Sequence, residues 1–500
     1  MKKSSFTIGI LLPALLLTAT FGFAQHRGDN LAFQGLSLRN ESGVKALAMG
    51  GAYTSITGEV ASLFYNPAGL ADVQKFQLSV SANRYKKLWR ENQVFRTNRL
   101  FLTLPFYLER LYIPNPENNG QWDYEIFIRE RDSSYVVQDP KLGAEPYSSE
   151  AAEWEKTTDD FLFDHIAAAL PLNVAGKDIV LSAAYHRSYD VLDFDRNDTY
   201  LDPHVGYDEY GVAERVSNDT LRMDWYTFQR QRSGTLHSLT AAVAYKVNRN
   251  IKLGVGFASM SGETQDAQQL DKVGWFDLTK NNRFRFSYDT LNTSIKGTSK
   301  FSATSLNVGT VLTFDHFSFG FNYKAGYTLK RSWQYSTVTT DTLQSLSSSG
   351  SGEDKMSVPA GYRLGVTFMP VQQFLISFDY ESTPYSRASF SLASNDSTHR
   401  DWVDQGIVRF GLEYRPKAWL SLLAGYRNMP TTFVPDGAAF KDRGPAAESF
   451  TAGISLRTGS GRLDVAYEIR RLKYYDSYYS NTNYALEAWD NLVIGYMLEF

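Results

Sequence analysis

The chain has 500 residues, a formal net charge of −3 and a mean hydropathy of −0.34. This near-neutral charge excludes the global basic field of nucleic-acid-binding proteins, and the absence of cysteine excludes disulfides and thiolate metal sites. Tyrosine (31 residues) and phenylalanine (32 residues) are abundant, and the composition favours one large architecture over two or three soluble domains.

The N-terminus has the features of a signal peptide, residues 1–24. Two lysines follow Met1, residues 8–21 are apolar, and Gly22 and Ala24 are the small residues of a cleavage site. The apolar run is too short for a comfortable membrane span, and no later stretch reaches about 18 apolar residues. We therefore expect an exported chain that is either soluble or a membrane β-barrel.

Residues 25–75 precede the first predicted strand and are rich in small and apolar side chains. They are too few for a stable independent domain. Two short helical turns are predicted, the first ending at Gly50 and Gly51 and the second covering residues 60–65. A wide barrel leaves a lumen in which such turns can be buried, so a hatch inside the lumen is predicted. A periplasmic lid or a disordered leader remains the alternative.

The second turn ends at Asn66-Pro67-Ala68-Gly69. The ring of Pro67 blocks continuation of a helix, and Gly69 frees the chain to reach the barrel rim. This motif is therefore predicted to separate the last turn of the hatch from the first strand of the wall.

The remaining chain alternates apolar and polar residues with the period of a β-strand. The pattern is clearest in residues 317–327, 374–381, 408–414 and 462–470. The strands are about 10 residues long, the length needed to cross a bilayer at a tilt. The predicted fold is an all-β transmembrane antiparallel barrel over residues 76–500.

Short and long connections alternate strictly, as tight periplasmic turns and long outer loops do in outer-membrane barrels. The short connections are residues 171–177, 247–250, 315–316, 370–372, 416–418 and 458–461. The long ones are residues 86–159, 190–234, 262–300, 330–357, 382–403, 428–446 and 472–488. These connections predict fourteen strands, the first at residues 76–84 and the last at residues 489–500.

Sixteen strands are the alternative count, because residues 100–108 and 123–131 also have strand character. Pro105 argues against a central strand, so both segments are interpreted as structure within the first long loop. Two other segments are interpreted as loop: residues 345–355 as a flexible tip, and the acidic residues 190–204, which lack calcium-loop spacing, as a solvated loop.

The chain ends on an amphipathic strand whose outer residues include Tyr496, Leu498 and Phe500. A terminal aromatic residue on such a strand resembles the signal read by the barrel-assembly machinery of Gram-negative bacteria. We therefore expect this machinery as a partner.

No catalytic or metal-binding motif is found. The seven histidines are scattered, without the spacing of a zinc site, and no nucleophile elbow or nucleotide-binding glycine pattern occurs. Ser182 and His186 share one strand face, but so do many inert pairs, so we expect no enzyme, cofactor or metal. The alternation directs a further set of charged residues into the lumen, as an ordinary barrel wall requires: Arg409, Glu413, Arg462, Asp464, Glu468 and Arg470.

Three segments carry a resemblance to a known family. The N-terminal stretch VKALAMGGAYTSITGEVASLFYNPAGLA resembles the signature of the FadL/TodX-type outer-membrane transporters of hydrophobic compounds. The resemblance continues in residues 357–370 and 422–469. It implies a fourteen-strand barrel closed by an N-terminal hatch, with Asn66-Pro67-Ala68-Gly69 in the place of the family's Asn-Pro-Ala motif.

The resemblance implies passive uptake of hydrophobic small molecules, such as long-chain fatty acids or aromatics, with release through a gap in the barrel wall. The expected surroundings are the bacterial outer membrane, its lipid and its lipopolysaccharide. Related barrels serve protein secretion and share the N-terminal signature. A structural barrel that binds a protein partner through its long loops is therefore the alternative function.

Overall fold

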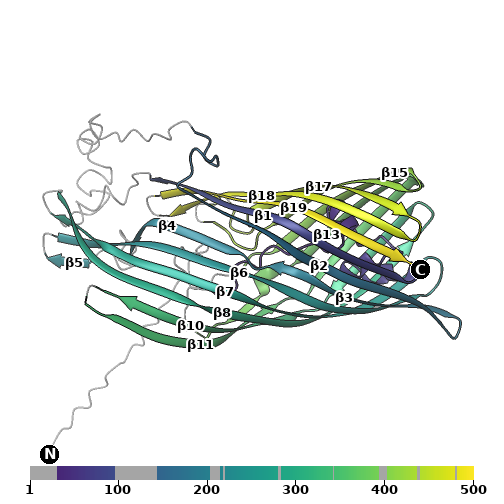
Figure 1. Cartoon of the computed structure of the whole chain (residues 1–500), viewed down its shortest axis with the longest axis horizontal. Helices are drawn as coiled ribbons and strands as arrows, with labels where there is room; N and C mark the ends of the chain where they lie inside the picture. The colour runs from purple at the N-terminus through teal and green to yellow at the C-terminus, as the bar shows by residue number, and fades with distance from the viewer. Residues whose placement is uncertain are drawn as a thin grey trace, which may run out of the picture.

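The structure is a computed structural model that describes residues 31–95, 144–202, 214–217, 220–279, 283–341, 343–393, 402–435, 438, 440–478 and 481–500. The predicted signal peptide and residues 100–108 and 123–131 lie outside these ranges. The strands form one closed antiparallel sheet (Figure 1). They are β1 (Gln77–Phe95), β2 (Trp154–Val174), β3 (Lys177–Asp190), β4 (Asp193–Asp202), β5 (Glu214–Ser217), β6 (Thr220–Lys246), β7 (Ile251–Thr279), β8 (Arg283–Thr313), β9 (Phe317–Lys324), β10 (Tyr327–Thr340), β11 (Ser345–Val358), β12 (Gly361–Val371), β13 (Phe374–Thr383), β14 (Ser389–Ser391), β15 (Gln405–Lys417), β16 (Leu420–Pro430), β17 (Ala446–Thr458), β18 (Gly461–Tyr478) and β19 (Asn481–Glu499).

Fourteen extended segments make up the wall of the barrel, as predicted. Four of them are interrupted and therefore count as two strands each: β3 with β4, β9 with β10, β11 with β12, and β13 with β14. The barrel closes between β1 and β19, where Leu78 faces Leu498. Because β1 also pairs directly with β2, no strand lies between them, and the closed wall formed by the described residues has fourteen strands and not the alternative sixteen.

The strands extend much further than predicted on the side of the long loops. β6, β7 and β8 have 27, 29 and 31 residues, far more than a bilayer crossing requires. β1 continues to Phe95 and β19 begins at Asn481. The apolar alternation used for the prediction ends at the membrane boundary, because beyond it both faces of a strand can contact water.

Two predicted loops are therefore strands. The expected flexible tip, residues 345–355, lies in β11, where it pairs with β10. The expected solvated loop, residues 190–204, contains β4, which pairs with β6. In β4 the carboxylate of Asp193 accepts a hydrogen bond of 2.7 Å from Arg230, so this acidic stretch supplies ion pairs to the sheet.

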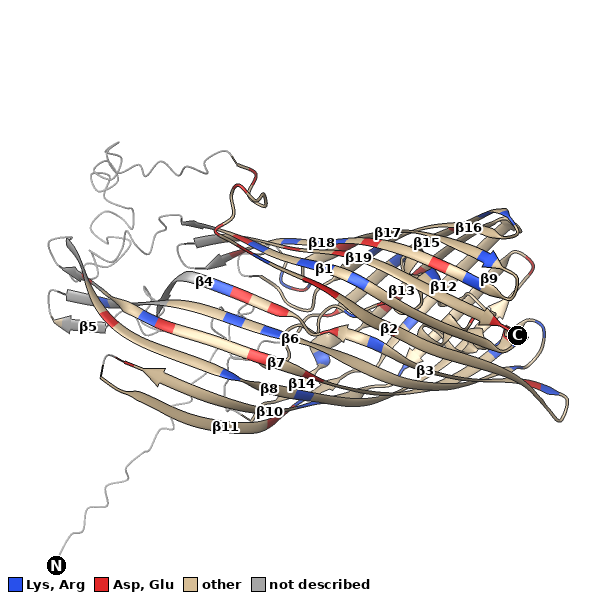
Figure 2. Cartoon of the chain, in the orientation of Figure 1, with Lys and Arg blue, Asp and Glu red and all other residues tan. Residues whose placement is uncertain are grey.

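The wall has an apolar outer face and a polar inner face. Along β9, Phe319, Phe321 and Tyr323 are exposed, whereas Ser318 and Asn322 are buried. This is the reverse of a soluble sheet and is the pattern of an outer-membrane barrel. Figure 2 shows bands of Lys, Arg, Asp and Glu that cross β4, β6 and β7 side by side.

Helical structure in the described chain is short. α1 (Val44–Ala48), η1 (Val60–Phe64) and η2 (Pro67–Asp72) lie in the N-terminal segment, defined here as residues 31–75, and η6 (Tyr385–Arg387) follows β13. Within the described ranges, no helix is long and apolar enough to span a membrane.

The N-terminal segment packs inside the barrel, against glycines of the wall. A side chain at any of these glycines would collide with the segment. On Gly365 a Cβ would lie 2.7 Å from Thr54, on Gly411 2.6 Å from the carbonyl of Met49, and on Gly495 2.6 Å from Val44. The contacting glycines lie on eight strands, β7, β8, β9, β12, β15, β16, β17 and β19: Gly254, Gly309, Gly320, Gly365, Gly411, Gly425, Gly453 and Gly495.

We expect Gly309→Ala to lower the free energy of unfolding by about 1–3 kcal/mol, the usual cost of overpacking. The added methyl group would collide with the side-chain amide of Asn66. Urea unfolding in detergent micelles, followed by tryptophan fluorescence, measures the change. Gly350→Ala is the matched control, since its Cβ would lie 3.6 Å from Trp333 in ordinary contact. Equal stability of the two variants would contradict the packing described here.

Candidate functional site

Gly50 and Gly51 form the turn that follows α1. Their φ angles are 66° and 80°, a left-handed conformation that favours glycine. The turn also touches the wall, because a Cβ on Gly50 would lie 2.7 Å from the carbonyl oxygen of Tyr426. The Gly50 amide donates a hydrogen bond of 3.1 Å to Thr451 Oγ1. Both glycines are therefore required by local conformation and by close packing.

Asn66-Pro67-Ala68-Gly69 begins η2, a buried helix that the sequence did not predict. Asn66 is its N-cap and accepts a bond of 3.1 Å from the Ala68 amide, and Pro67 occupies the first helical position, where proline is favoured. The prediction that residues 60–65 are the last buried turn is therefore wrong. Pro67 does end η1, but it also starts the next helix.

Gly69 serves packing and not flexibility. Its φ angle is not positive, but a Cβ there would lie 2.5 Å from the carbonyl oxygen of Ile56 and 2.8 Å from Ser62. The expectation that Gly69 frees the chain to reach the rim is corrected accordingly. Asn66 also donates from Nδ2 to the carbonyl oxygens of Thr54 and Thr310, at 2.9 and 3.1 Å. The motif thus joins the N-terminal segment to β8.

Charged side chains of the N-terminal segment form ion pairs with the wall. The shortest contacts of these pairs are Arg39–Glu381 at 3.3 Å, Glu41–Arg409 at 2.8 Å, Lys45–Glu413 at 3.3 Å, Glu59–Arg462 at 2.9 Å and Asp72–Lys252 at 2.8 Å. Three of the wall residues, Arg409, Glu413 and Arg462, were predicted only to face the lumen. Sequence reasoning missed their partners, although charges in an otherwise apolar segment signal that pairing is needed.

Glu41 is the most enclosed carboxylate that the N-terminal segment contributes to these pairs. Burial acts to raise its pKa, but the guanidinium groups of Arg409 and Arg427 hold the pKa at about 2. Arg409 and Arg427 are themselves fully buried. Glu41 is therefore ionised at neutral pH. Because its pKa lies below the ordinary value, the stability it contributes is present above about pH 4.5 and is lost as the pH falls towards 2.

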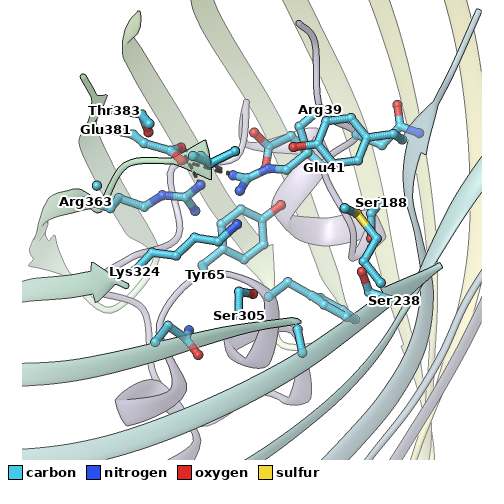
Figure 3. Close-up of a pocket in the computed structure, with 18 of the residues that line it drawn as sticks. Arg39, Glu41, Tyr65, Ser188, Ser238, Ser305, Lys324, Arg363, Glu381 and Thr383 are labelled. Atoms are coloured by element: carbon cyan, nitrogen blue, oxygen red, sulfur yellow. Dashed lines mark hydrogen bonds and ion pairs between the residues drawn. The ribbon is translucent and has the colours of Figure 1, made fainter. Parts of the chain in front are cut away.

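A cavity of about 160 Å³ lies between the N-terminal segment and the outer half of the barrel (Figure 3). One part of its lining is apolar or aromatic and includes Leu36, Phe64, Met260, Val358, Ile407 and Met429. The rest of the lining is polar. It includes uncharged residues such as Ser238 and Asn322, four cationic side chains, Arg39, Lys324, Arg363 and Arg409, and two carboxylates, Glu41 and Glu381. The lining is thus amphipathic and carries an excess of positive charge.

Lys324 differs from the other cations of the cavity. Arg39, Arg363 and Arg409 all form ion pairs with Glu381. Lys324 lies over the Tyr327 ring at 4.7 Å, and no carboxylate among the described residues forms an ion pair with it. Figure 3 shows its side chain extending into the cavity beside Tyr65. Its ammonium group is therefore available to an anionic ligand.

The wall is split beside the cavity. β2 and β3 pair only as far as His165 and His186. Beyond that point β2 keeps β1 as its partner and β4 keeps β6, and no backbone pairing between β2 and β4 exists among the residues described. Side chains cross the split: Trp154 donates to the carbonyl oxygen of Arg196 at 3.0 Å, and Lys87 to that of Leu192 at 3.3 Å.

The N-terminal segment covers the base of this split. Phe64 packs against His165 and His186, with ring centroids 5.5 and 4.7 Å apart. The amide of Asn40 donates to the carbonyl oxygen of Ser188 at 3.0 Å. The weakest part of the wall is therefore in direct contact with the segment that fills the lumen.

The remaining predicted residues are accounted for as follows. Ser182 donates to the backbone of Ala168, and His186 contacts Ser42 and Thr240, so the two do not form a pair. Within the described ranges, no group of three potential ligands is placed to hold a metal ion.

At the chain end, the Phe500 amide donates to the carbonyl oxygen of Phe76 at 3.0 Å. Tyr496, Leu498 and Phe500 lie on the seam with β1, and their recognition by the assembly machinery stays a prediction.

Comparisons with known proteins agree with this architecture. Residues 226–439 match the family described as outer membrane protein transport protein (OMPP1/FadL/TodX). The match includes residues 357–370, which carried part of the resemblance, but not the N-terminal segment. No curated protein sequence matches the chain.

Solved structures show the same fold at low identity. A Pseudomonas aeruginosa FadL homologue aligns with a TM-score of 0.58 and 12% identity over 96% of this chain and 99% of its own. The P. putida toluene transporter TodX gives 0.55 and 11% over 92% and 98%, and the Ralstonia pickettii toluene transporter TbuX gives 0.50 and 13% over the same shares. The closed fourteen-strand wall therefore has the fold of the FadL/TodX-type outer-membrane β-barrels, and residues 226–439 match the model of that family.

Proposed function

We propose that the chain carries hydrophobic small molecules passively across the bacterial outer membrane, with residues 25–75 as a hatch. The single observation that supports this function is the amphipathic cavity above a filled lumen. A hatch prevents a standing pore, and an apolar lining replaces the water that a hydrophobic solute would otherwise meet. The toluene transporters TodX and TbuX share the fold, but they do not identify the solute carried here.

The cavity favours an amphiphile that bears an acidic group over a neutral hydrocarbon. The cavity lining contains the cations Lys324, Arg363 and Arg409 together with apolar residues such as Phe64 and Met429. An anionic head would bind Lys324 without displacing an existing ion pair. A long-chain fatty acid has the required combination of a carboxylate and an apolar chain.

Lys324→Gln should weaken binding of a long-chain fatty acid by roughly tenfold to a hundredfold, the value of a charged hydrogen bond. Binding of toluene should not change, because the apolar lining is intact. Titration of the purified barrel with a fluorescent fatty acid measures the first effect, and Lys417→Gln, an exposed lysine at a periplasmic turn, is the control.

Uptake by intact cells tests the transport proposal itself. Deletion of the protein should slow uptake of the labelled fatty acid, and the wild-type chain should restore it. Unchanged uptake, together with stoichiometric capture of a secretion protein, would overturn transport in favour of the partner-binding barrel. The long outer extensions of β6, β7 and β8 are the feature that such a partner would contact.

We expect Glu41→Gln to loosen the hatch, because Arg409 and Arg427 would each lose a buried partner. Removing one member of a buried ion pair costs about 3–5 kcal/mol. The measurement is the leak of a small hydrophilic dye from proteoliposomes, which should rise in the variant. Glu353→Gln, which removes an exposed carboxylate beside Lys355, is the matched control. An unchanged leak in Glu41→Gln would show that this ion pair does not hold the hatch.

The split between β2 and β4 is the proposed lateral exit, because only side chains close it. Asp164 and Arg187 face each other near its base, with 4.0 Å between carboxylate and guanidinium atoms. The chain has no cysteine, so Asp164→Cys with Arg187→Cys can be joined selectively by a short bismaleimide. We expect this cross-link to block uptake. The same reagent on Ala167→Cys with Ala184→Cys, in the paired part of the wall, should leave uptake intact. Equal uptake in both would exclude this exit.

A further inference from the structure

The outer surface of β7, β8, β10 and β11 changes character at a constant height. The unbroken run of exposed apolar side chains ends at Phe257 on β7, Leu306 on β8, Tyr323 on β9 and Tyr362 on β12. Further out, isolated exposed apolar side chains occur at Leu291 and Tyr288 on β8 and at Leu346 on β11. The first outward positions beyond the unbroken run are polar, among them Ser302. This change marks the edge of the lipid-facing band on this side of the barrel.

Three lysines lie just beyond this edge. A tilted strand crosses the hydrocarbon layer in about ten residues, which places its outer boundary near Ser302 when counted from Leu312. Lys300 is the next outward residue on β8. The same count reaches Tyr327 on β10 from Phe317 and Val358 on β11 from Phe368, and Lys330 and Lys355 lie three residues further out on these strands. We name Lys300, Lys330 and Lys355, all exposed, the lysine patch.

The register places like charges opposite each other in the patch. Lys330 pairs directly with Lys355, and Lys300 faces Ser332 in the neighbouring pair. Like charges directly opposite destabilise a sheet. Two carboxylates lie nearby: Glu353 is 2.9 Å from Lys355 and Glu263 is 3.9 Å from Lys300. Lys330 forms no ion pair with any described carboxylate, so the patch retains positive charge.

Two other outward charge pairs of the wall are matched across the strands. Arg84 forms two hydrogen bonds with Asp159, at 3.0 and 2.9 Å. Arg471 and Asp490 pair at 2.8 Å. The lysine patch departs from this pattern on three adjacent strands. An external anion bound at the patch would offset the repulsion between the two opposed lysines.

The residues around the lysines define the chemistry of that anion. They carry hydroxyl and amide groups, which hydrogen-bond to sugars: Ser302, Thr328, Ser332, Gln334, Ser351 and Ser357. We propose that the lysine patch binds the phosphates of a phosphorylated glycolipid in the outer leaflet, of the lipid A type. The patch lies just beyond the lipid-facing band, where lipid headgroups are located. Its lysines can bind phosphate, and the surrounding hydroxyl and amide groups can hydrogen-bond to a glucosamine backbone.

Binding of bisphosphorylated lipid A to the purified barrel in detergent tests the proposal, with native mass spectrometry as the measurement. The triple variant Lys300→Gln, Lys330→Gln and Lys355→Gln should bind at least tenfold more weakly than the wild-type chain. A triple variant of Lys75, Lys177 and Lys417 to Gln changes the net charge equally at exposed positions on the periplasmic side, and it should bind as the wild type does. Lipid A without its phosphates should bind the wild-type chain weakly. Its affinity should equal that of intact lipid A for the triple variant of the lysine patch.

Three results would overturn the proposal. One is equal binding of lipid A to the wild type and the patch variant, and another is an equal loss in the periplasmic variant. The third is displacement of lipid A by inorganic phosphate at the same concentration, which would show a phosphate site without lipid recognition. Folding is checked by the shift in gel migration on heating. If the triple variant does not fold, the double variant Lys330→Gln and Lys355→Gln answers the same question, and the triple Lys→Arg variant should keep binding.

Discussion

A fourteen-strand wall encloses more space than its own side chains can fill, and the rest of the structure depends on how that space is occupied. The N-terminal segment fills it by approaching the backbone of the wall directly. Contacts this close are possible only where the wall lacks side chains, which explains the glycines at Gly365, Gly411 and Gly495. They also remove water from charged groups, which explains why enclosed charges such as Glu41 and Arg409 pair with each other.

The same charges border the cavity and hold the segment. Glu381 pairs with Arg39 from the segment and with Arg363 and Arg409 from the wall. A ligand that attracts Arg363 therefore acts on a carboxylate that also secures the segment. Lys324 lies outside this network and faces the open space. A ligand can therefore bind Lys324 without breaking an ion pair. Binding to Arg39, Arg363 or Arg409 would instead weaken the ion pairs with Glu381 that hold the segment.

Much of the fold was predictable because a membrane strand must alternate between lipid and lumen. The six turns, the fourteen strands and the closing strands follow from that alternation. Strand ends were not predictable, because the constraint vanishes in water: residues 345–355 and 190–204 have no apolar face and were interpreted as loops. η2 was missed because Pro67 is both a helix breaker and a favoured first residue of a helix.

The candidate site was predictable only in part. The motif at Asn66 and the glycines Gly50 and Gly51 are visible in the sequence because they depend on local conformation. The ion pairs of Arg409, Glu413 and Arg462 join residues more than 350 positions apart, and alternation alone cannot assign their partners. The split between β2 and β4 depends on register, which the sequence does not encode locally.

The ring of glycine contacts also constrains how the molecule is assembled. The segment that fills the lumen lies near the start of the chain, whereas Gly495, one of the wall residues that it contacts, lies five residues before Phe500. The complete set of contacts between the segment and the wall therefore forms only after β19 has joined the sheet. A wall that closed first would have to admit the segment through an opening already bounded by hydrogen-bonded strands.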